Sequence, residues 1–314
     1  MIRSRFLLVL ALLFPAFALA QTPAAQPPLL LRSPSLSQDL IAFRYADDIW
    51  TVSREGGVAE RLTSDGEVIA GPYYSPNGDW IAYSAHLNGN NDAYVIAATG
   101  GVPRRLTWHP AGSYVVGWSA DGKDVLMTGG EASYRHYFRL FRVHADGSGI
   151  PEPLPLPSGA QGSFSPDGTS LAYVPVRRIQ PAWKRYVGGN ATPVWIVNLK
   201  TLDVVKVPRD NSNDSNPVWV GDSVYFLSDR DSAGKNSGPV SLYRYDVASQ
   251  QVSQAAPNTS FDLKSFQAGP GGLVYEQFGS IHLFDPAAKT DKIVPIQVHG
   301  ELANLAPRRV KLDA

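Results

Sequence analysis

The sequence predicts an all-β protein: a six-bladed β-propeller of four-stranded antiparallel blades, preceded by a signal peptide. A phrase recurs at 74–83, 118–127 and 164–173, where an aromatic residue and a serine precede an Asn-Gly or Asp-Gly turn. Glycine supplies the positive φ that a tight hairpin turn needs. The 28 Gly and 25 Pro also favour many short strands joined by turns over helices.

Each repeat predicts one blade, with a first strand ending in an aromatic residue, an apolar second and third strand, and a more polar last strand. The second strands are spaced by about 40 to 53 residues, as in propellers. They centre on Ala42, Ala82, Leu126, Ala172, Tyr225 and Val274. The third strands are expected at 48–52, 93–96, 140–143, 194–197, 242–245 and 281–284.

The phase of the repeat predicts how the ring closes. Blade one begins with its own first strand near 30–33, and blade six ends with its own last strand near 292–296. No blade is split between the termini, so we expect the ring to close by side-chain packing between blades one and six. The charges of Arg61, Arg104 and Arg105 fall on last strands, where they are expected to discourage edge pairing.

The N-terminus predicts export. Arg3 and Arg5 precede an apolar stretch at 6–17, and Ala18-Leu19-Ala20 fits a signal-peptidase site. We therefore expect a signal peptide at 1–20, a short linker at 21–29, the propeller at 30–297 and the start of a linker to an absent domain at 298–314. The expected location is the periplasm, and no segment is long and apolar enough to predict a membrane span.

The composition and motifs argue against several functions. The 28 basic and 28 acidic residues balance, which gives no electrostatic case for binding nucleic acid. The six His residues show no metal-ligand spacing, and no nucleophile elbow is present. The loop at 229–234 alternates oxygen ligands, but Val240 stands where an EF-hand needs a carboxylate. We expect no catalytic residue, no metal and no cofactor in this chain.

One loop interrupts the repeat. The stretch 180–189 contains Trp183, Lys184, Arg185 and Tyr186, a basic and aromatic composition that suits a docking surface or a channel rim. The alternative is that cations stack on aromatic rings merely to hold a long loop. His109, in a connection between blades, is a further candidate, for which the alternative is an ordinary surface histidine.

Several segments together resemble a known family. They are 46–50, 54–63, 104–110, 116–118, 183–189 and 225–231. On these residues the chain resembles the N-terminal six-bladed propeller of the bacterial tricorn-type serine peptidases. The resemblance implies a longer protein, with a seven-bladed propeller, a PDZ domain and a catalytic core whose serine and histidine have no counterpart here. We therefore expect an N-terminal fragment or a truncated relative of such a peptidase.

The resemblance also implies a role. The propeller would guide or filter peptides on their way to or from the catalytic core, with Trp183, Lys184, Arg185, Tyr186 and His109 as candidate channel or docking residues. The expected partners are peptides and the other domains of the peptidase, and self-association stays open. Two alternatives remain: a free-standing TolB-like propeller that binds protein partners, and the propeller of a prolyl-oligopeptidase-like hydrolase. The gene downstream of codon 314 would discriminate among the three.

Overall fold

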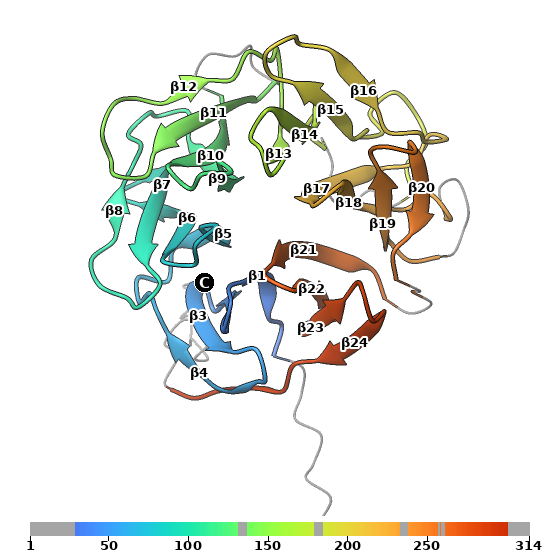
Figure 1. Cartoon of the computed structure of the whole chain (residues 1–314). Helices are drawn as coiled ribbons and strands as arrows, with labels where there is room; N and C mark the ends of the chain where they lie inside the picture. Colours follow the sequence, from blue (N-terminus) through green and yellow to red (C-terminus); the bar gives the residue numbers. More distant parts are fainter. Residues whose placement is uncertain are drawn as a thin grey trace, which may run out of the picture.

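Six β-sheets stand around a central axis, each running outward from the axis like a blade (Figure 1). The structure is a computed structural model that describes residues 29–130, 137–178, 185–232, 238–256, 258 and 261–300. The expected signal peptide lies outside the described residues, as do Trp183 and Lys184. Within the described ranges, no helix is long and apolar enough to cross a membrane.

The first three blades are each made from consecutive strands. Blade one contains β1 (Arg32–Leu36), β2 (Leu40–Tyr45), β3 (Asp48–Ser53) and β4 (Gly57–Arg61). Blade two contains β5 (Val68–Tyr74), β6 (Trp80–Leu87), β7 (Asn90–Ala97) and β8 (Arg104–Arg105). Blade three contains β9 (Ser113–Trp118), β10 (Asp124–Gly129), β11 (Arg139–His144) and β12 (Glu152–Pro153).

The last three blades repeat the same order from the axis outward. Blade four contains β13 (Gln161–Phe164), β14 (Ser170–Val174), β15 (Trp195–Asn198) and β16 (Val204–Lys206). Blade five contains β17 (Asp214–Val220), β18 (Ser223–Ser228), β19 (Ser241–Asp246) and β20 (Gln251–Gln254). Blade six contains β21 (Leu263–Gly269), β22 (Gly272–Gln277), β23 (Ser280–Asp285) and β24 (Thr290–Ile293).

The burial of the strands follows their place in the blade. Every residue of β18 is buried, whereas every residue of β16 and β24 is exposed. Second and third strands pack against neighbouring blades on both faces, which is why they are nearly continuous apolar runs. All six predicted second strands are confirmed, since their centres fall within β2, β6, β10, β14, β18 and β22. Gly78 turns between β5 and β6 at φ +80°, as the repeated phrase predicted.

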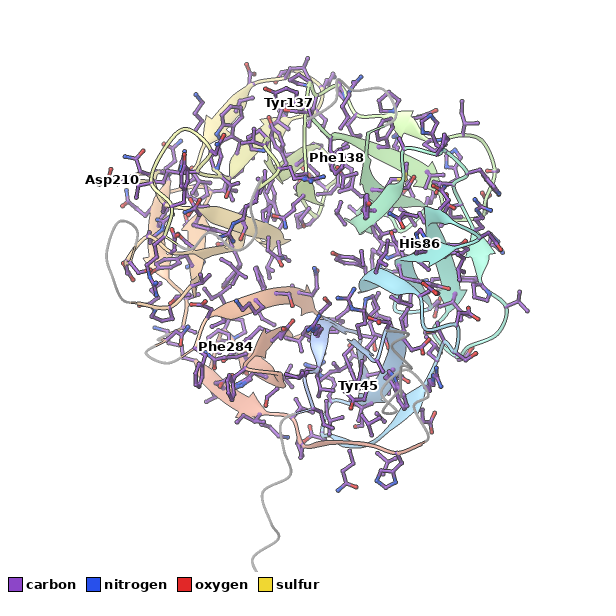
Figure 2. The ribbon with its side chains drawn as sticks, turned by 180° about the vertical axis from the view of Figure 1, so that it is seen from behind. Tyr45, His86, Tyr137, Phe138, Asp210 and Phe284 are labelled. Carbon is purple, nitrogen blue, oxygen red and sulfur yellow. The ribbon has the colours of Figure 1, made fainter. Side chains whose placement is uncertain are left out.

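The seam between blades one and six is packed as predicted. One core cluster joins Leu36, Ile41 and Phe43 of blade one to Val274 and Ile281 of blade six. Figure 2 shows the side chains of both blades, with Tyr45 labelled in blade one and Phe284 labelled in blade six. Each blade contains its own four consecutive strands, so no blade is split between the ends of the described chain.

The closure also includes a hydrogen-bonded strand that the sequence did not predict. β25 (Ile296–Val298) pairs in parallel with β4, so blade one has five strands (Figure 1). The expectation of closure by side-chain packing was therefore incomplete. The last strand of blade six ends at Ile293, and Ile296 belongs to blade one.

The expected role of the outer arginines was also wrong in part. β4 is not a free edge, because β25 covers it. Arg61 pairs with Asp48, and Arg105 Nη2 lies 2.6 Å from Asp92 Oδ2, both carboxylates being fully buried. These two arginines therefore neutralise buried acids within the blade, whereas Arg104 remains exposed on β8.

Candidate functional site

An open channel of about 590 Å³ runs along the axis of the ring. It is lined by residues of the first strand of every blade, β1, β5, β9, β13, β17 and β21. The turns that carry the repeated serine, such as Ser75-Pro76 and Ser165-Pro166, surround one end. Scaffold residues of the repeat thus form one mouth of the channel.

The channel wall is uncharged over the residues that the structure describes. Among the described residues that line it there is no Asp, Glu, Lys, Arg or His; the wall is aromatic, aliphatic, hydroxyl and amide. Burial raises the pKa of the Tyr73 phenol to about 12, an effect that the nearby Arg44 partly offsets. Tyr73 therefore stays neutral at physiological pH. Along the described wall, a chain passing through this channel would meet no charged side chain that could hold it.

Several polar groups of the wall hold neighbouring blades together. The Gln161 side-chain oxygen accepts a 2.8 Å hydrogen bond from the Asn216 backbone N–H, and Ser163 Oγ accepts a 3.0 Å bond from the Trp219 backbone N–H. The Asn216 side chain in turn donates to the Phe266 carbonyl at 3.1 Å. Because each first strand is the inner edge of its blade, its axis-facing backbone groups have no neighbouring strand and need these partners. The wall is thereby fixed in shape.

A second pocket of about 570 Å³, which we call the vestibule, lies at the other end of the channel over blades four, five and six. In an antiparallel blade the loop after the second strand lies at the same end as the start of the first strand. The vestibule is lined by both kinds of segment. Ala160 and Gln161 line both the channel and the vestibule, so the two adjoin at the start of β13.

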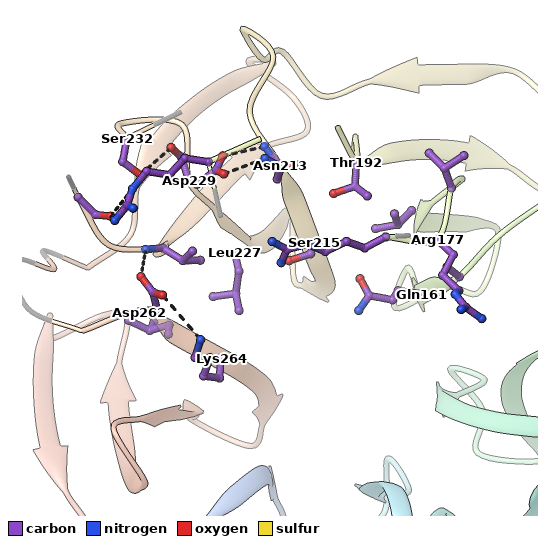
Figure 3. Close-up of a pocket in the computed structure, with 18 residues that line it drawn as sticks. Gln161, Arg177, Thr192, Asn213, Ser215, Leu227, Asp229, Ser232, Asp262 and Lys264 are labelled. Carbon is purple, nitrogen blue, oxygen red and sulfur yellow. Dashed lines mark hydrogen bonds and ion pairs between the residues drawn. The ribbon is translucent and has the colours of Figure 1, made fainter. Parts of the chain in front are cut away.

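Side chains from three blades face one another across the vestibule. Figure 3 shows the labelled residues Gln161, Arg177, Thr192, Asn213, Ser215, Asp229, Asp262 and Lys264 around it. Arg177 follows β14, Asp229 follows β18, and Lys264 lies at the start of β21. The ring, not the local sequence, therefore brings these charges together.

The candidate loop of blade four reaches the vestibule in part. Arg185 lines it, and its guanidinium donates from Nε (3.1 Å) and Nη2 (2.5 Å) to the Gly238 carbonyl in the corresponding loop of blade five. The Tyr186 carbonyl accepts a 2.8 Å bond from the Asn213 side chain. Both interactions tie the loop to blade five through hydrogen bonds.

His109 lies elsewhere, exposed in the connection between β8 and β9. Its Nδ1 accepts a 3.2 Å bond from the Ala111 backbone N–H, and its carbonyl accepts a 3.1 Å bond from the Asn90 side chain. It lines neither the channel nor the vestibule. Among the described residues, no group of three or more His, Asp or Glu side chains could hold a metal ion.

Sequence reasoning missed the other cationic residues of the vestibule, Arg177, Arg178 and Lys264. Arg177 and Arg178 precede the candidate loop, and Lys264 lies more than 80 residues later in the chain. Their place relative to the predicted strands could have identified them, because each lies just after a second strand or at the start of a first strand. Such positions meet at one end of a propeller.

The fold defines the protein as a six-bladed β-propeller with an open axial channel. A family model described as the tricorn protease N-terminal beta propeller domain matches residues 28–290. Tricorn protease homolog 1 of Streptomyces coelicolor is 31% identical over 267 residues, 84% of this chain and 24% of that protein. The chain belongs to the family of tricorn protease N-terminal β-propeller domains. It spans about a quarter of the length of the first curated relatives it matches.

Solved structures agree with the fold. The crystal structure of the tricorn protease superposes with a TM-score of 0.73 at 24% identity, covering 85% of this chain and 26% of that one. A putative TolB from Agrobacterium tumefaciens gives a TM-score of 0.59 at 23% identity, covering 73% of this chain and 81% of that one. At these identities the likeness concerns the fold alone.

Proposed function

We propose that this chain is the non-catalytic propeller of an exported tricorn-type serine peptidase, and that it guides peptides to or from a catalytic core. The observation that carries the proposal is the open channel, whose described lining residues are uncharged and which adjoins a polar vestibule. A neutral, rigid wall offers little to retain a peptide, so selection depends on width and on the chemistry of the mouths. The family membership supports the peptidase context.

The proposed location is the periplasm. The support is the N-terminal stretch, with Arg3 and Arg5, an apolar segment and Ala18-Leu19-Ala20. The partners proposed with it are peptides and the remaining domains of the peptidase.

The channel can be tested with single cysteines, because the chain has none of its own. Ala70 lines the channel and makes no side-chain hydrogen bond, so Ala70→Cys places a thiol in the wall. Ala288→Cys in the exposed turn between β23 and β24 is the matched control. We expect an extended peptide to slow maleimide labelling of residue 70 but not of residue 288.

A blocking experiment tests the route itself. A bulky maleimide at residue 70 of the peptidase that carries this propeller should slow turnover of long peptides by about tenfold, an increase of about 1.4 kcal/mol in the barrier. The same label at residue 288 should leave turnover unchanged. Equal labelling rates with and without peptide at residue 70, together with unaltered turnover after blocking, would refute the guiding role. Capture of a folded protein partner instead of peptides would favour the TolB-like alternative.

A further inference from the structure

The sequence contains two Asn-Gly pairs, and both lie in tight turns of blade two. Asn77-Gly78 lies between β5 and β6, and Asn88-Gly89 lies between β6 and β7. Both asparagines are exposed, and φ is +80° at Gly78 and +79° at Gly89. The two pairs share exposure and glycine conformation, so a difference in their hydrogen bonds can be read directly.

The first pair is held by its own turn. Asn77 Oδ1 accepts a 2.7 Å hydrogen bond from Ser75 Oγ, and Asn77 Nδ2 donates to Asp79 Oδ2 at 2.6 Å. The backbone N–H of Gly78 donates to the Ser75 carbonyl at 2.9 Å. Neither the Asn77 side chain nor the Gly78 nitrogen can move without breaking one of these bonds.

The second pair has none of these restraints. Within the described ranges, the Asn88 side chain and the Gly89 backbone N–H have no hydrogen-bond partner. A Cβ at Gly89 would meet no atom within 4 Å, so open space surrounds the turn. The turn closes on the outermost pair of the hairpin, Leu87 with Asn90, so it can open without disturbing the core of the blade.

An unrestrained Asn-Gly pair can react with itself. The Gly89 backbone nitrogen attacks Asn88 Cγ and closes a five-membered succinimide ring, while the Cγ–Nδ2 bond breaks and Nδ2 leaves as ammonia with the Gly89 proton. Water then opens the ring. Addition at the side-chain carbonyl gives aspartate, and addition at the main-chain carbonyl gives isoaspartate. Glycine favours the attack, because no Cβ obstructs the approach of its nitrogen.

We propose that Asn88 is a site of spontaneous covalent modification, at which the folded chain converts asparagine to aspartate and isoaspartate while Asn77 is protected. Each product places a carboxylate where an amide stood. The turn follows a second strand, so the new negative charge arises at the end of the propeller where the vestibule lies. This inference goes beyond the peptidase function and does not depend on it.

Isoaspartate also lengthens the main chain of the turn by a methylene group. The next two residues connect the hairpin to blade three. Asn90 Nδ2 donates to Asp92 Oδ1 at 3.0 Å and to the His109 carbonyl at 3.1 Å. Asn91 Nδ2 donates to Tyr114 Oη at 2.8 Å, and Tyr114 lines the channel. A turn displaced by isoaspartate therefore weakens contacts that reach the channel wall.

The test ages the full chain in mildly alkaline buffer and measures both sites in one digest. Chymotrypsin cleaves after aromatic residues, so cuts at Trp80 and Tyr83 separate the two pairs. Mass spectrometry follows the replacement of amide by acid, and an isoaspartyl methyltransferase quantifies isoaspartate. We expect Asn88 to convert about tenfold faster than Asn77 in the folded chain, because hydrogen bonds restrain Asn77 alone. In denaturant the two rates should become equal, since each asparagine is followed by glycine.

Variants separate the causes. Ser75→Ala removes a bond to Asn77, so it should speed conversion of Asn77 several-fold and leave Asn88 unchanged; an unchanged melting temperature shows that it is folded. Asn88→Asp supplies the charge without the longer main chain, and an aspartate tolerates a positive φ as asparagine does. Hydrogen exchange at the Asn91 amide should therefore be faster in the aged wild type than in Asn88→Asp.

Three results would overturn the inference. The first is an equal rate at both asparagines of the folded chain, or a faster rate at Asn77. The second is a preference for Asn88 that persists undiminished in denaturant, because the flanking sequence and not the fold would then be its cause. The third concerns the channel: exchange at Asn91 that is no faster in isoaspartate-containing protein than in Asn88→Asp would overturn the coupling to the wall.

Discussion

The backbone N–H of Gly57 donates a 2.8 Å hydrogen bond to the carbonyl of Pro295. This bond begins the parallel pairing in which Ile296, Gln297 and Val298 match Gly57, Val58 and Ala59. The outer edge of blade one is thus covered by residues more than 230 positions later in the chain. The two ends of the propeller are held by backbone hydrogen bonds as well as by the core of the seam.

Gly56 is the residue on which this contact depends most. Its φ is +90°, and a Cβ there would lie 2.7 Å from Pro295 Cδ. Gly100 holds the same place in blade two at φ +91°, where a Cβ would meet Leu62 Cδ1 at a comfortable 3.7 Å. The two positions share a backbone conformation and differ in their neighbours.

We therefore predict that Gly56→Ala destabilises the protein more than Gly100→Ala does. Both variants carry the cost of about 1–2 kcal/mol for a side chain at positive φ. Gly56→Ala should cost a further ~1–2 kcal/mol, because the Pro295 segment must move away. Urea unfolding measures the difference. Equal losses in the two variants would mean that the contact between Gly56 and Pro295 contributes nothing to closure.

The neighbouring arginines of β8 give a second prediction. Arg105 pairs with the buried Asp92, whose Oδ1 also accepts a 3.1 Å bond from Thr107 Oγ1. Arg104 is exposed and donates to the Ala145 carbonyl at 2.9 Å. Arg105→Ala should cost about 3 kcal/mol, because it leaves a buried carboxylate without its counter-charge. Arg104→Ala should cost less than about 1 kcal/mol.

Denaturant unfolding of the two variants, with Asp92→Asn combined with Arg105→Ala as a third, checks this prediction. Removing the charge of Asp92 should restore part of the stability that Arg105→Ala loses. If the two single arginine variants unfold at the same denaturant concentration, both arginines act merely as surface charges.

The sequence predicted the local features of the fold and not its long-range contacts. The repeated phrase predicted the blades, since its turns and apolar strands are local patterns. The Asp-Arg-Thr arrangement was also accessible, because Asp92, Arg105 and Thr107 repeat the spacing of Asp48, Arg61 and Thr63. The pairing of β25 was not accessible, because three residues without a hairpin turn pair in parallel with a strand at the far end of the chain.

The set of residues that line the vestibule could not be predicted from the sequence, for a similar reason. Arg177 and Lys264 belong to different blades, and only closure of the ring places them around one pocket. The loop at 180–189 stood out by its basic and aromatic composition. Arg185 of this loop donates hydrogen bonds to the Gly238 carbonyl, so it helps to position the loops as well as adding a positive charge. Composition singled out a loop of which Arg185 reaches the vestibule, but it did not single out Arg177 or Lys264.

Alkaline pH should destabilise the fold through buried tyrosines. Burial raises the pKa of Tyr74 to about 12, and of Tyr73 likewise to about 12, from about 10 in the unfolded chain. Between pH 10 and 12 the unfolded state releases these protons while the native state retains them. Stability is therefore fully present below pH 10 and falls as the pH rises through this window.

Tyr74→Phe removes one of these groups and should flatten that decline. The difference in the free energy of unfolding, variant minus wild type, should rise by about 1 kcal/mol from pH 8 to pH 11. The reason is that ionisation of Tyr74 in the unfolded state lowers the stability of the wild type at pH 11 and not at pH 8. Denaturant unfolding at the two pH values measures the gain. The same difference between variant and wild type at both pH values would contradict a raised pKa at this position.

The tether between Arg185 and Gly238 should control the rigidity of the vestibule. The guanidinium of Arg185 joins the loops of blades four and five, and the nearby Val240 N–H donates to Asp262 at 3.0 Å. Arg185→Gln should therefore speed hydrogen exchange at the Val240 amide several-fold, with little loss of global stability, because local opening does not require unfolding of the blades. Arg142→Gln is the control, since that arginine pairs with Glu152 at 2.9 Å on the exposed edge of blade three. Exchange at Val240 that is unchanged by Arg185→Gln, or accelerated equally by Arg142→Gln, would show that the tether does not set the shape of this mouth.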